Sequence, residues 1–387
     1  MKRSGGISAA GVMAVGMVFA GLSGAAATAA EFAVFPATAN QEYPDIDGTV
    51  VVWQQSGVGG DYDIHVADIS DPGQVWHHVI GNSSWQQYPA VWGDSVVWQE
   101  YFGAAGSGDW DIMLADISDR DAPAIYPVSG IIGNDEVMPA IYGNTVVWQD
   151  GASGDYDIYG ADVTHPGIPV EFAVSIPLYN QQTPAIYDRT VVWEDDYFVD
   201  WDIYAADIRL RNKPTEKAVA TFAGDQKNPA IWGDIVVWQD DGFGDWDIRG
   251  ANLSGEGEPV EFAIVSDPAS QENPAISGHI VVWQDNRHGN WDIYGYNLTT
   301  RREFRITNHS ASQIHPAISG NRVVWQDNRS GRWNIYATVL NAVDAATCKA
   351  PPAGDANGDC RVDFRDFALM ASSWLDCGLE PAEACGR

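Results

Sequence analysis

The chain repeats one short pattern, two apolar residues followed by tryptophan, seven times. Successive copies are 42 to 50 residues apart. The tryptophans of these segments are Trp53, Trp98, Trp148, Trp193, Trp238, Trp283 and Trp325. Each copy holds four short apolar segments between turn residues, such as 274–277, 279–284, 292–297 and 302–307 in the sixth copy. A period of this length built from strands predicts an all-β protein, a β-propeller in which each copy forms one blade.

The ends of the repeat region predict how the ring closes. The fifth and sixth copies have fourth segments at 260–264 and 302–306, but no fourth segment follows the seventh copy. Residues 31–34, near the N-terminus, have the same Glu-Phe-Ala-Val pattern. We expect this segment to become the outer strand of the last blade, which predicts a closed ring of seven blades. Six blades plus an irregular pair is the alternative, because the first two copies have divergent fourth segments.

Residues 1–30 have the pattern of a secretory signal peptide. Lys2 and Arg3 precede an apolar run at 7–22, and Ala-Thr-Ala at 27–29 is a small-residue cleavage pattern. The run is short for a membrane anchor, which is the alternative, and no other stretch is apolar enough to span a bilayer. We therefore expect a secreted protein, extracellular, at the cell surface or periplasmic, whose propeller covers residues 31–346.

The composition is strongly acidic. The whole chain has 21 Lys and Arg against 53 Asp and Glu, a net charge of −32. Without Lys2 and Arg3 the charge is −34. Such a surface repels nucleic acids and anionic membranes, so we expect neither as a partner.

The repeat resembles the TolB-like, PD40-type propeller repeat. The resemblance rests on a proline in the first strand, the apolar second strand, a turn with glycine, and Asp-Ile-Tyr, here at 157–159, 202–204 and 292–294. It covers about residues 31–346 and implies the propeller fold. The periplasmic member of that family has six blades and an additional N-terminal domain for which this chain has no room, so the resemblance implies no role in the Tol system.

Residues 347–387 differ in composition from the rest of the chain, because they hold all four cysteines. An even number of cysteines in a short exported segment predicts two disulfides. The tail resembles a single dockerin repeat with an EF-hand-like loop at 355–366 followed by an amphipathic helix. That resemblance implies Ca²⁺ as cofactor and a cohesin-like partner, although dockerins carry two such loops. The implied ligands are Asp355, Asn357, Asp359, Arg361 through its carbonyl, Asp363 and Asp366.

The sixth loop position holds Cys360, where such loops usually have glycine. A disulfide would hold the turn there, so among the three possible pairings we favour Cys360 with Cys377 and Cys348 with Cys385. An acidic turn held by disulfides without calcium is the alternative.

Two sets of repeated side chains are candidate ligand-binding residues. The first set stands three residues before each inner-strand proline and is predicted to ring the channel mouth: Gln41, Gln86, Glu136, Gln181, Gln226, Gln271 and Gln313. The second set pairs an aromatic residue with an acid, and its tryptophans are Trp110, Trp201, Trp246 and Trp291. Aromatic faces beside amides and carboxylates suit sugars. A structural role is the alternative for the glutamine ring. Packing between blades is the alternative for the aromatic set, and tying down turns is the alternative for its acids.

Catalysis has one candidate constellation. Arg287 and His288 and, in the next copy, Arg329 are predicted in adjacent loops, which His315 could approach. The sequence favours an exported propeller that binds a polysaccharide or a surface protein and is attached through its calcium-binding tail. The alternative is a polysaccharide-degrading enzyme, a lyase or a glycoside hydrolase.

Overall fold

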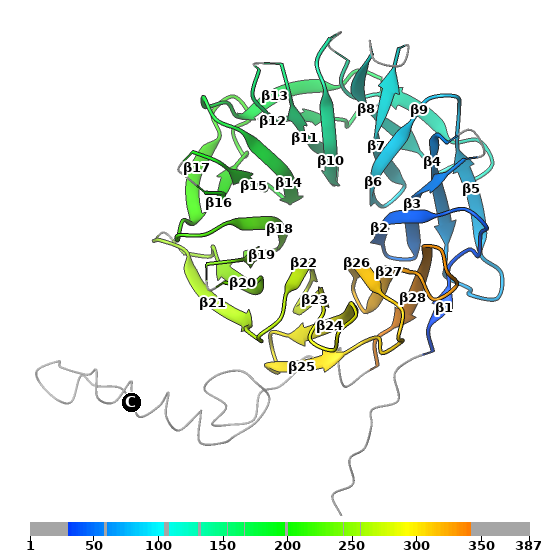
Figure 1. Cartoon of the computed structure of the whole chain (residues 1–387). Coiled ribbons are helices and arrows are strands. Elements are labelled where there is room, and N and C mark those ends of the chain that lie inside the picture. The colour runs from blue at the N-terminus through cyan, green and yellow to red at the C-terminus, as the bar shows by residue number, and fades with distance from the viewer. Residues whose placement is uncertain are drawn as a thin grey trace, which may run out of the picture.

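Each copy of the repeat folds into one antiparallel four-stranded sheet, and seven sheets stand around a central opening (Figure 1). The computed structural model describes residues 30–341 except 58–59, 104–107, 131–132, 153, 166, 198–199, 243 and 256. The predicted seven blades are confirmed, and the six-bladed alternative is wrong. The signal peptide and the dockerin-like tail, with its helix, calcium ligands and cysteines, lie outside these residues.

The strands of the first four blades follow in chain order from the inside of the ring to its rim. Blade 1 comprises β2 (Gln41–Asp47), β3 (Val50–Ser56), β4 (Tyr62–Asp68) and β5 (Trp76–Ile80). Blade 2 comprises β6 (Gln86–Trp92), β7 (Ser95–Phe102), β8 (Asp109–Asp116) and β9 (Ala124–Pro127). Blade 3 comprises β10 (Glu136–Tyr142), β11 (Thr145–Asp150), β12 (Asp157–Asp162) and β13 (Val170–Ser175). Blade 4 comprises β14 (Gln181–Tyr187), β15 (Thr190–Asp195), β16 (Asp202–Asp207) and β17 (Thr215–Ala220).

The remaining blades keep the same order, except for the last outer strand. Blade 5 comprises β18 (Gln226–Trp232), β19 (Ile235–Asp240), β20 (Asp247–Asn252) and β21 (Val260–Val265). Blade 6 comprises β22 (Gln271–Ser277), β23 (Ile280–Asp285), β24 (Asp292–Asn297) and β25 (Arg302–Arg305). Blade 7 comprises β26 (Gln313–Ser319), β27 (Arg322–Asp327), β28 (Asn334–Val339) and, as its outer strand, β1 (Phe32–Ala33).

The N-terminal strand closes the ring as the sequence predicts. Phe32 pairs with Ala337 and Ala33 with Tyr336, and the N–H of Val34 donates to the carbonyl of Ile335 at 2.8 Å. Figure 1 shows β1 in blue beside β28 in orange. The exchange joins the two ends of the propeller and leaves β28 no open edge.

The core consists of apolar layers between neighbouring blades. Trp98 of blade 2, for example, packs in one cluster with Val52 and Ile64 of blade 1. All seven repeated tryptophans are fully buried. In five blades the indole N–H donates to the carboxylate two residues later, as from Trp283 to Asp285 at 3.1 Å. Blade 3 has the same Trp-x-acid spacing without this bond, and blade 1 has Gln55 in place of the acid.

Within the part of the chain that the structure describes, every regular element is a strand, and no helix could cross a membrane.

Candidate functional site

Every inner strand has the same bulge immediately before its proline. In β22, for example, the pairing with β23 shifts register between Glu272 and Ala275. The residue before the proline adopts a left-handed backbone in all seven blades, with φ between 49° and 54°. The seven residues are Tyr43, Tyr88, Met138, Thr183, Asn228, Asn273 and His315. Such a conformation is uncommon outside glycine, and its presence in every blade shows that the frame imposes it.

A hydrogen bond from the preceding blade holds each bulge. The N–H of His315 donates to the side-chain oxygen of Gln284 at 3.0 Å, and that of Tyr43 donates to Gln326 at 2.8 Å. The same bond recurs at all seven interfaces, with lengths of 2.7 to 3.0 Å. The acceptor is the residue after the repeated tryptophan, which is glutamine in six blades and Glu194 in blade 4. The contact between blades therefore requires only the backbone N–H of the bulge residue, and the side chain of that residue can vary.

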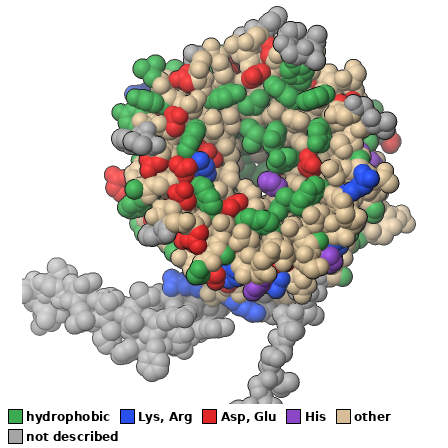
Figure 2. All heavy atoms as spheres, viewed as in Figure 1, with side chains coloured by type: hydrophobic (Ala, Val, Ile, Leu, Met, Phe, Trp, Pro, Cys, Tyr) green, Lys and Arg blue, Asp and Glu red, His purple; other side chains and the backbone are tan. Residues whose placement is uncertain are grey.

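The seven bulge side chains and their prolines line a cavity of about 310 Å³ at the central channel. On one side the ring of Tyr43 lies 4.7 Å from that of Tyr88 and 4.9 Å from that of His315. On the other side the amide of Asn228 donates to Asn273 at 3.0 Å. Figure 2 shows hydrophobic side chains gathered around the central opening. The channel thus has an aromatic side and an amide side.

The cavity lining carries no formal charge at neutral pH. It contains no Asp, Glu, Lys or Arg among the described residues. Burial lowers the pKa of His315 to about 4, so its ring is neutral above about pH 5. Burial, followed by the neighbouring Tyr88, raises the pKa of Tyr43 well above its usual range. On a chain with a net charge of −32, this uncharged surface is a local exception.

The predicted ring of six glutamines and Glu136 is not open to a ligand. All seven residues are buried, with exposed fractions of 0 to 1 %. Their side chains join the blades instead: Gln41 accepts from the N–H of Ile335, and Gln86 accepts from that of Ile64. Gln181, Gln226, Gln271 and Gln313 donate to carbonyls of the loops before their own strands. The prediction of open ligand-binding groups at this position is corrected, because the blade interfaces need these amides.

The predicted aromatic set is half-buried at the ends of the blades. Trp110, Trp201, Trp246 and Trp291 each precede a mostly buried acid. The backbone of Trp201 joins blades 4 and 5, since its N–H donates to Asp225 and its carbonyl accepts from Gln226. The ring of Trp201 lies 5.6 Å from the ammonium of Lys227, the second residue of an inner strand. The backbones of these residues form interblade hydrogen bonds, as the alternative of a structural role predicts, and their side chains remain partly exposed.

The structure separates the four catalytic candidates. Arg287 is held by Asp285, Glu303 and Asp267 and lies over the ring of Tyr294. Arg329 is held in the same way in blade 7 by Asp327 and Glu31, over Tyr336.

His288 lies near Tyr294, beside Arg287, with 6.3 Å between the ring centres. His315, by contrast, faces the central channel. Each arginine neutralises a fully buried aspartate of its own blade. The ion pairs therefore give both arginines a structural role, apart from the catalytic role predicted from the sequence.

Of the bulge residues that line the channel, only His315 was a candidate from the sequence, and it was placed in another site. A partial signal was present, because the position before each proline varies among tyrosine, methionine, threonine, asparagine and histidine. The proline after it and the Gln or Glu two positions before it repeat, although the residue directly before it varies as well. This variation can be interpreted only once the bulge is known, because the bulge turns the residue toward the channel axis. Local sequence preferences do not predict the bulge. No group of three or more His, Cys, Asp or Glu residues placed to hold a metal occurs among the residues that the structure describes.

Comparisons with known proteins support the fold alone. No protein-family profile matches the chain, and no curated protein sequence does. A structure of oligogalacturonate lyase in complex with manganese has a TM-score of 0.57 at 14% identity and covers 82% of this chain and 95% of that chain. The propeller domain of the Trilobed protease from Pyrococcus furiosus has a TM-score of 0.57 at 12% identity and covers 82% of this chain and 100% of that one. That domain has an open velcro topology, whereas β1 closes the ring here.

Longer peptidases share the fold as well. A structure from work on two prolyl endopeptidases has a TM-score of 0.61 at 14% identity over 79% of this chain. The chain spans about half the length of these proteins, 47% of that endopeptidase and 50% of a Mycobacterium tuberculosis puromycin-hydrolyzing peptidase. The protein is therefore a seven-bladed β-propeller, the fold that the TolB-type resemblance implies.

Proposed function

We propose that this protein is a secreted carbohydrate-binding propeller whose ligand occupies the mouth of the central channel. The observation that carries the proposal is the ring of seven bulge residues. Their backbones are superimposable in conformation and hydrogen bonding, yet their side chains differ from blade to blade. The fold holds the backbone at this position but makes no demand on the side chain. The side chains can therefore differ between blades and provide specificity for a ligand.

The chemistry of the ring favours a sugar without charge. Tyr43 and Tyr88 offer aromatic faces for the C–H groups of a pyranose, and Asn228 and Asn273 face them with amide donors and acceptors for hydroxyls. Half-buried aromatics such as Trp201 would extend the surface outward for further residues of a polymer.

The remaining parts of the proposal rest on the sequence. Export rests on residues 1–30, and attachment through calcium and a cohesin-like partner rests on the dockerin-like residues 347–387. A polysaccharide-degrading enzyme remains the alternative function. The lyase-like fold is its support, while Arg287 and Arg329 are engaged in ion pairs within their blades.

The test is affinity electrophoresis of the protein in gels that contain soluble neutral polysaccharides. We expect one polymer to slow the protein. The variant Tyr43→Asn/Tyr88→Asn should weaken binding by at least about tenfold, because stacking on two rings is lost. Asparagine occupies the same bulge in blades 5 and 6, so the frame tolerates it. Glu258→Gln, which changes an exposed side chain outside the cavity, is the control and should bind within about twofold of the wild type. If no polymer slows the protein, a protein ligand becomes the better hypothesis.

A further inference from the structure

Blade 4 breaks the repeat at the end of the inner strands remote from the bulges. Its first turn is Asp188-Arg189, where every other blade has glycine followed by an uncharged or acidic residue. Asp188 keeps the left-handed backbone of those glycines, with φ of 53°. After its third strand blade 4 has Arg209, where the equivalent residues are Ser70, Ser118, Thr164, Ser254, Thr299 and Asn341. Arg189 and Arg209 each add a positive charge to a protein with few basic residues.

The fold does not require either arginine side chain. The N–H of Arg209 donates to Asp207 at 2.7 Å, and the N–H of Thr164 makes the same bond to Asp162 in blade 3 at 2.9 Å. The local turn is thus complete through the backbone alone. The side chains of Arg209 and Arg189 are 64 % and 53 % exposed.

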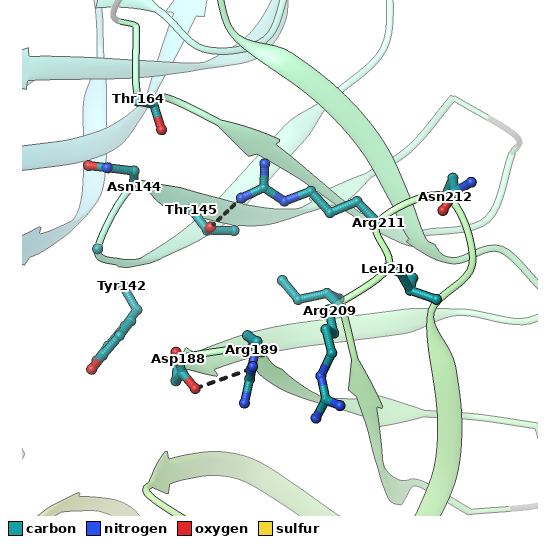
Figure 3. Close-up of a pocket in the computed structure, with 12 residues that line it drawn as sticks. Tyr142, Asn144, Thr145, Thr164, Asp188, Arg189, Arg209, Leu210, Arg211 and Asn212 are labelled. Carbon is teal, nitrogen blue, oxygen red and sulfur yellow. Dashed lines mark hydrogen bonds and ion pairs between the residues drawn. The ribbon is translucent and has the colours of Figure 1, made fainter.

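The departures meet in one groove between blades 3 and 4. The groove has a volume of about 800 Å³, and its lining includes Arg189, Arg209, Arg211 and Tyr142. Figure 3 shows Arg209 and Arg211 on one side of it and Tyr142 with Asn144 on the other. A second depression of about 510 Å³ shares Arg189 and Arg209 and continues onto blade 5. Together they form one elongated site across three blades.

The arginines are available to an anion. Arg189 lies 3.4 Å from Asp188 and Arg209 lies 3.2 Å from Asp207, and both pairs are exposed to solvent. Exposed ion pairs are weak and exchange readily. Arg211 is positioned by Asp162 and by Thr145 at 3.3 Å, which leaves further guanidinium N–H groups for a ligand. The lining of the larger groove holds three arginines and one acid, against a net charge of −32 for the chain. The smaller depression has three basic and three acidic residues, so the positive excess lies in the larger groove.

A strip of aromatic rings runs beside the arginines. Trp92, Tyr142, Tyr187 and Trp232 end the inner strands of blades 2 to 5. Successive ring centres are 4.1, 4.6 and 4.9 Å apart. The equivalent residues in the other blades are Asp47, Ser277 and Ser319, so the strip exists only where the groove is. Tyr142 lines the larger depression and Tyr187 the smaller one. Aromatic rings beside guanidinium groups match a chain of sugar rings that bears anionic substituents.

We propose that this groove, here named the blade-4 groove, binds an anionic glycan. Arg189, Arg209 and Arg211 hold its carboxylates or sulfates, and the aromatic strip contacts its sugar rings. The groove lies at the opposite end of the inner strands from the bulge residues, so this site is separate from the channel and does not rest on the function proposed for it.

The test is isothermal titration calorimetry of the full chain in EDTA, which removes calcium bridges between acidic groups. The probes are polygalacturonate fragments for carboxylates, dextran sulfate for sulfates, neutral dextran, and polyglutamate as a non-sugar anion. We expect at least one acidic glycan to bind, and neutral dextran not to bind. Binding of polygalacturonate fragments would identify carboxylates as the recognised groups, and binding of dextran sulfate would identify sulfates.

Three variants separate the groove from the rest of the surface. Arg189→Asn/Arg209→Thr gives blade 4 residues that blade 3 already has, so the fold should persist, and affinity should fall at least about tenfold. Arg332→Ser removes an exposed arginine from another loop and should change affinity less than about twofold. The channel variant Tyr43→Asn/Tyr88→Asn should keep the acidic glycan bound. Equal affinity of the Arg189/Arg209 variant and the wild type would refute the site, as would equal binding of polyglutamate or no binding of either acidic glycan.

Discussion

Asp202 is the most informative single residue for the energetics of the blades. It is 1 % exposed and pairs across the strands with Asp195, which is also buried. Burial in the first place, then Asp200 and Asp195, raise the pKa of Asp202 from 3.8 to about 7. Blades 6 and 7 neutralise the acid at the position of Asp195 with an arginine.

We predict that Asp202→Asn stabilises the protein at alkaline pH. A raised carboxyl pKa means that the folded state keeps a proton that the unfolded chain has lost. Its stability therefore falls as pH rises from about 4 to 7. One pKa unit corresponds to about 1.4 kcal/mol, so ionising Asp202 costs the folded state at most about 4 kcal/mol. Relaxation and water around the carboxylate reduce this, and we expect about 2 kcal/mol.

Blade 7 shows that asparagine fits this position. The amide of Asn334 donates to Ser330 at 2.8 Å and to the carbonyl of Arg332 at 3.3 Å. Thermal unfolding at pH 8 should give a midpoint about 4 °C above the wild type, and at pH 4 a difference below about 1 °C. Glu258→Gln removes one exposed charge and controls for net charge. A midpoint shift of Asp202→Asn that is the same at both pH values would refute the reasoning.

Two further predictions concern the ring. A chain that begins at Phe35 loses the pairing of β1 with β28 and the buried Val34, so its free energy of unfolding should fall by about 3 kcal/mol relative to a chain that begins at Glu31. An equal midpoint of the two chains in calorimetry would contradict the role of this strand. Gln284→Leu leaves the bulge N–H of His315 without its acceptor and should cost about 1–3 kcal/mol in denaturant unfolding, whereas a neutral effect would show that the bulge does not need the bond.

The glutamines predicted from the sequence as ligand-binding residues lie two positions before the residues that line the channel. Gln313 and its equivalents recur in every blade because every interface needs the same buried hydrogen bonds, so their repetition marks structure. His315 was placed among the catalytic candidates, yet it lies in the channel, apart from the ion-paired Arg287. A repeated residue and a functional residue look alike in one sequence, and only burial and hydrogen-bond partners separate them.

The number of blades, their strands and the closure of the ring could be predicted from the sequence alone. These features depend on the repeat period, on Val-Val-Trp segments that must be buried on both faces, and on one displaced strand, all of which are visible in a single chain. Which side chains face the channel and which join the blades depends on the packed structure. The reason is that a bulge held by the neighbouring blade turns Tyr43 and its equivalents inward, and that Arg189 and Arg209 meet in one groove only after three blades have packed side by side.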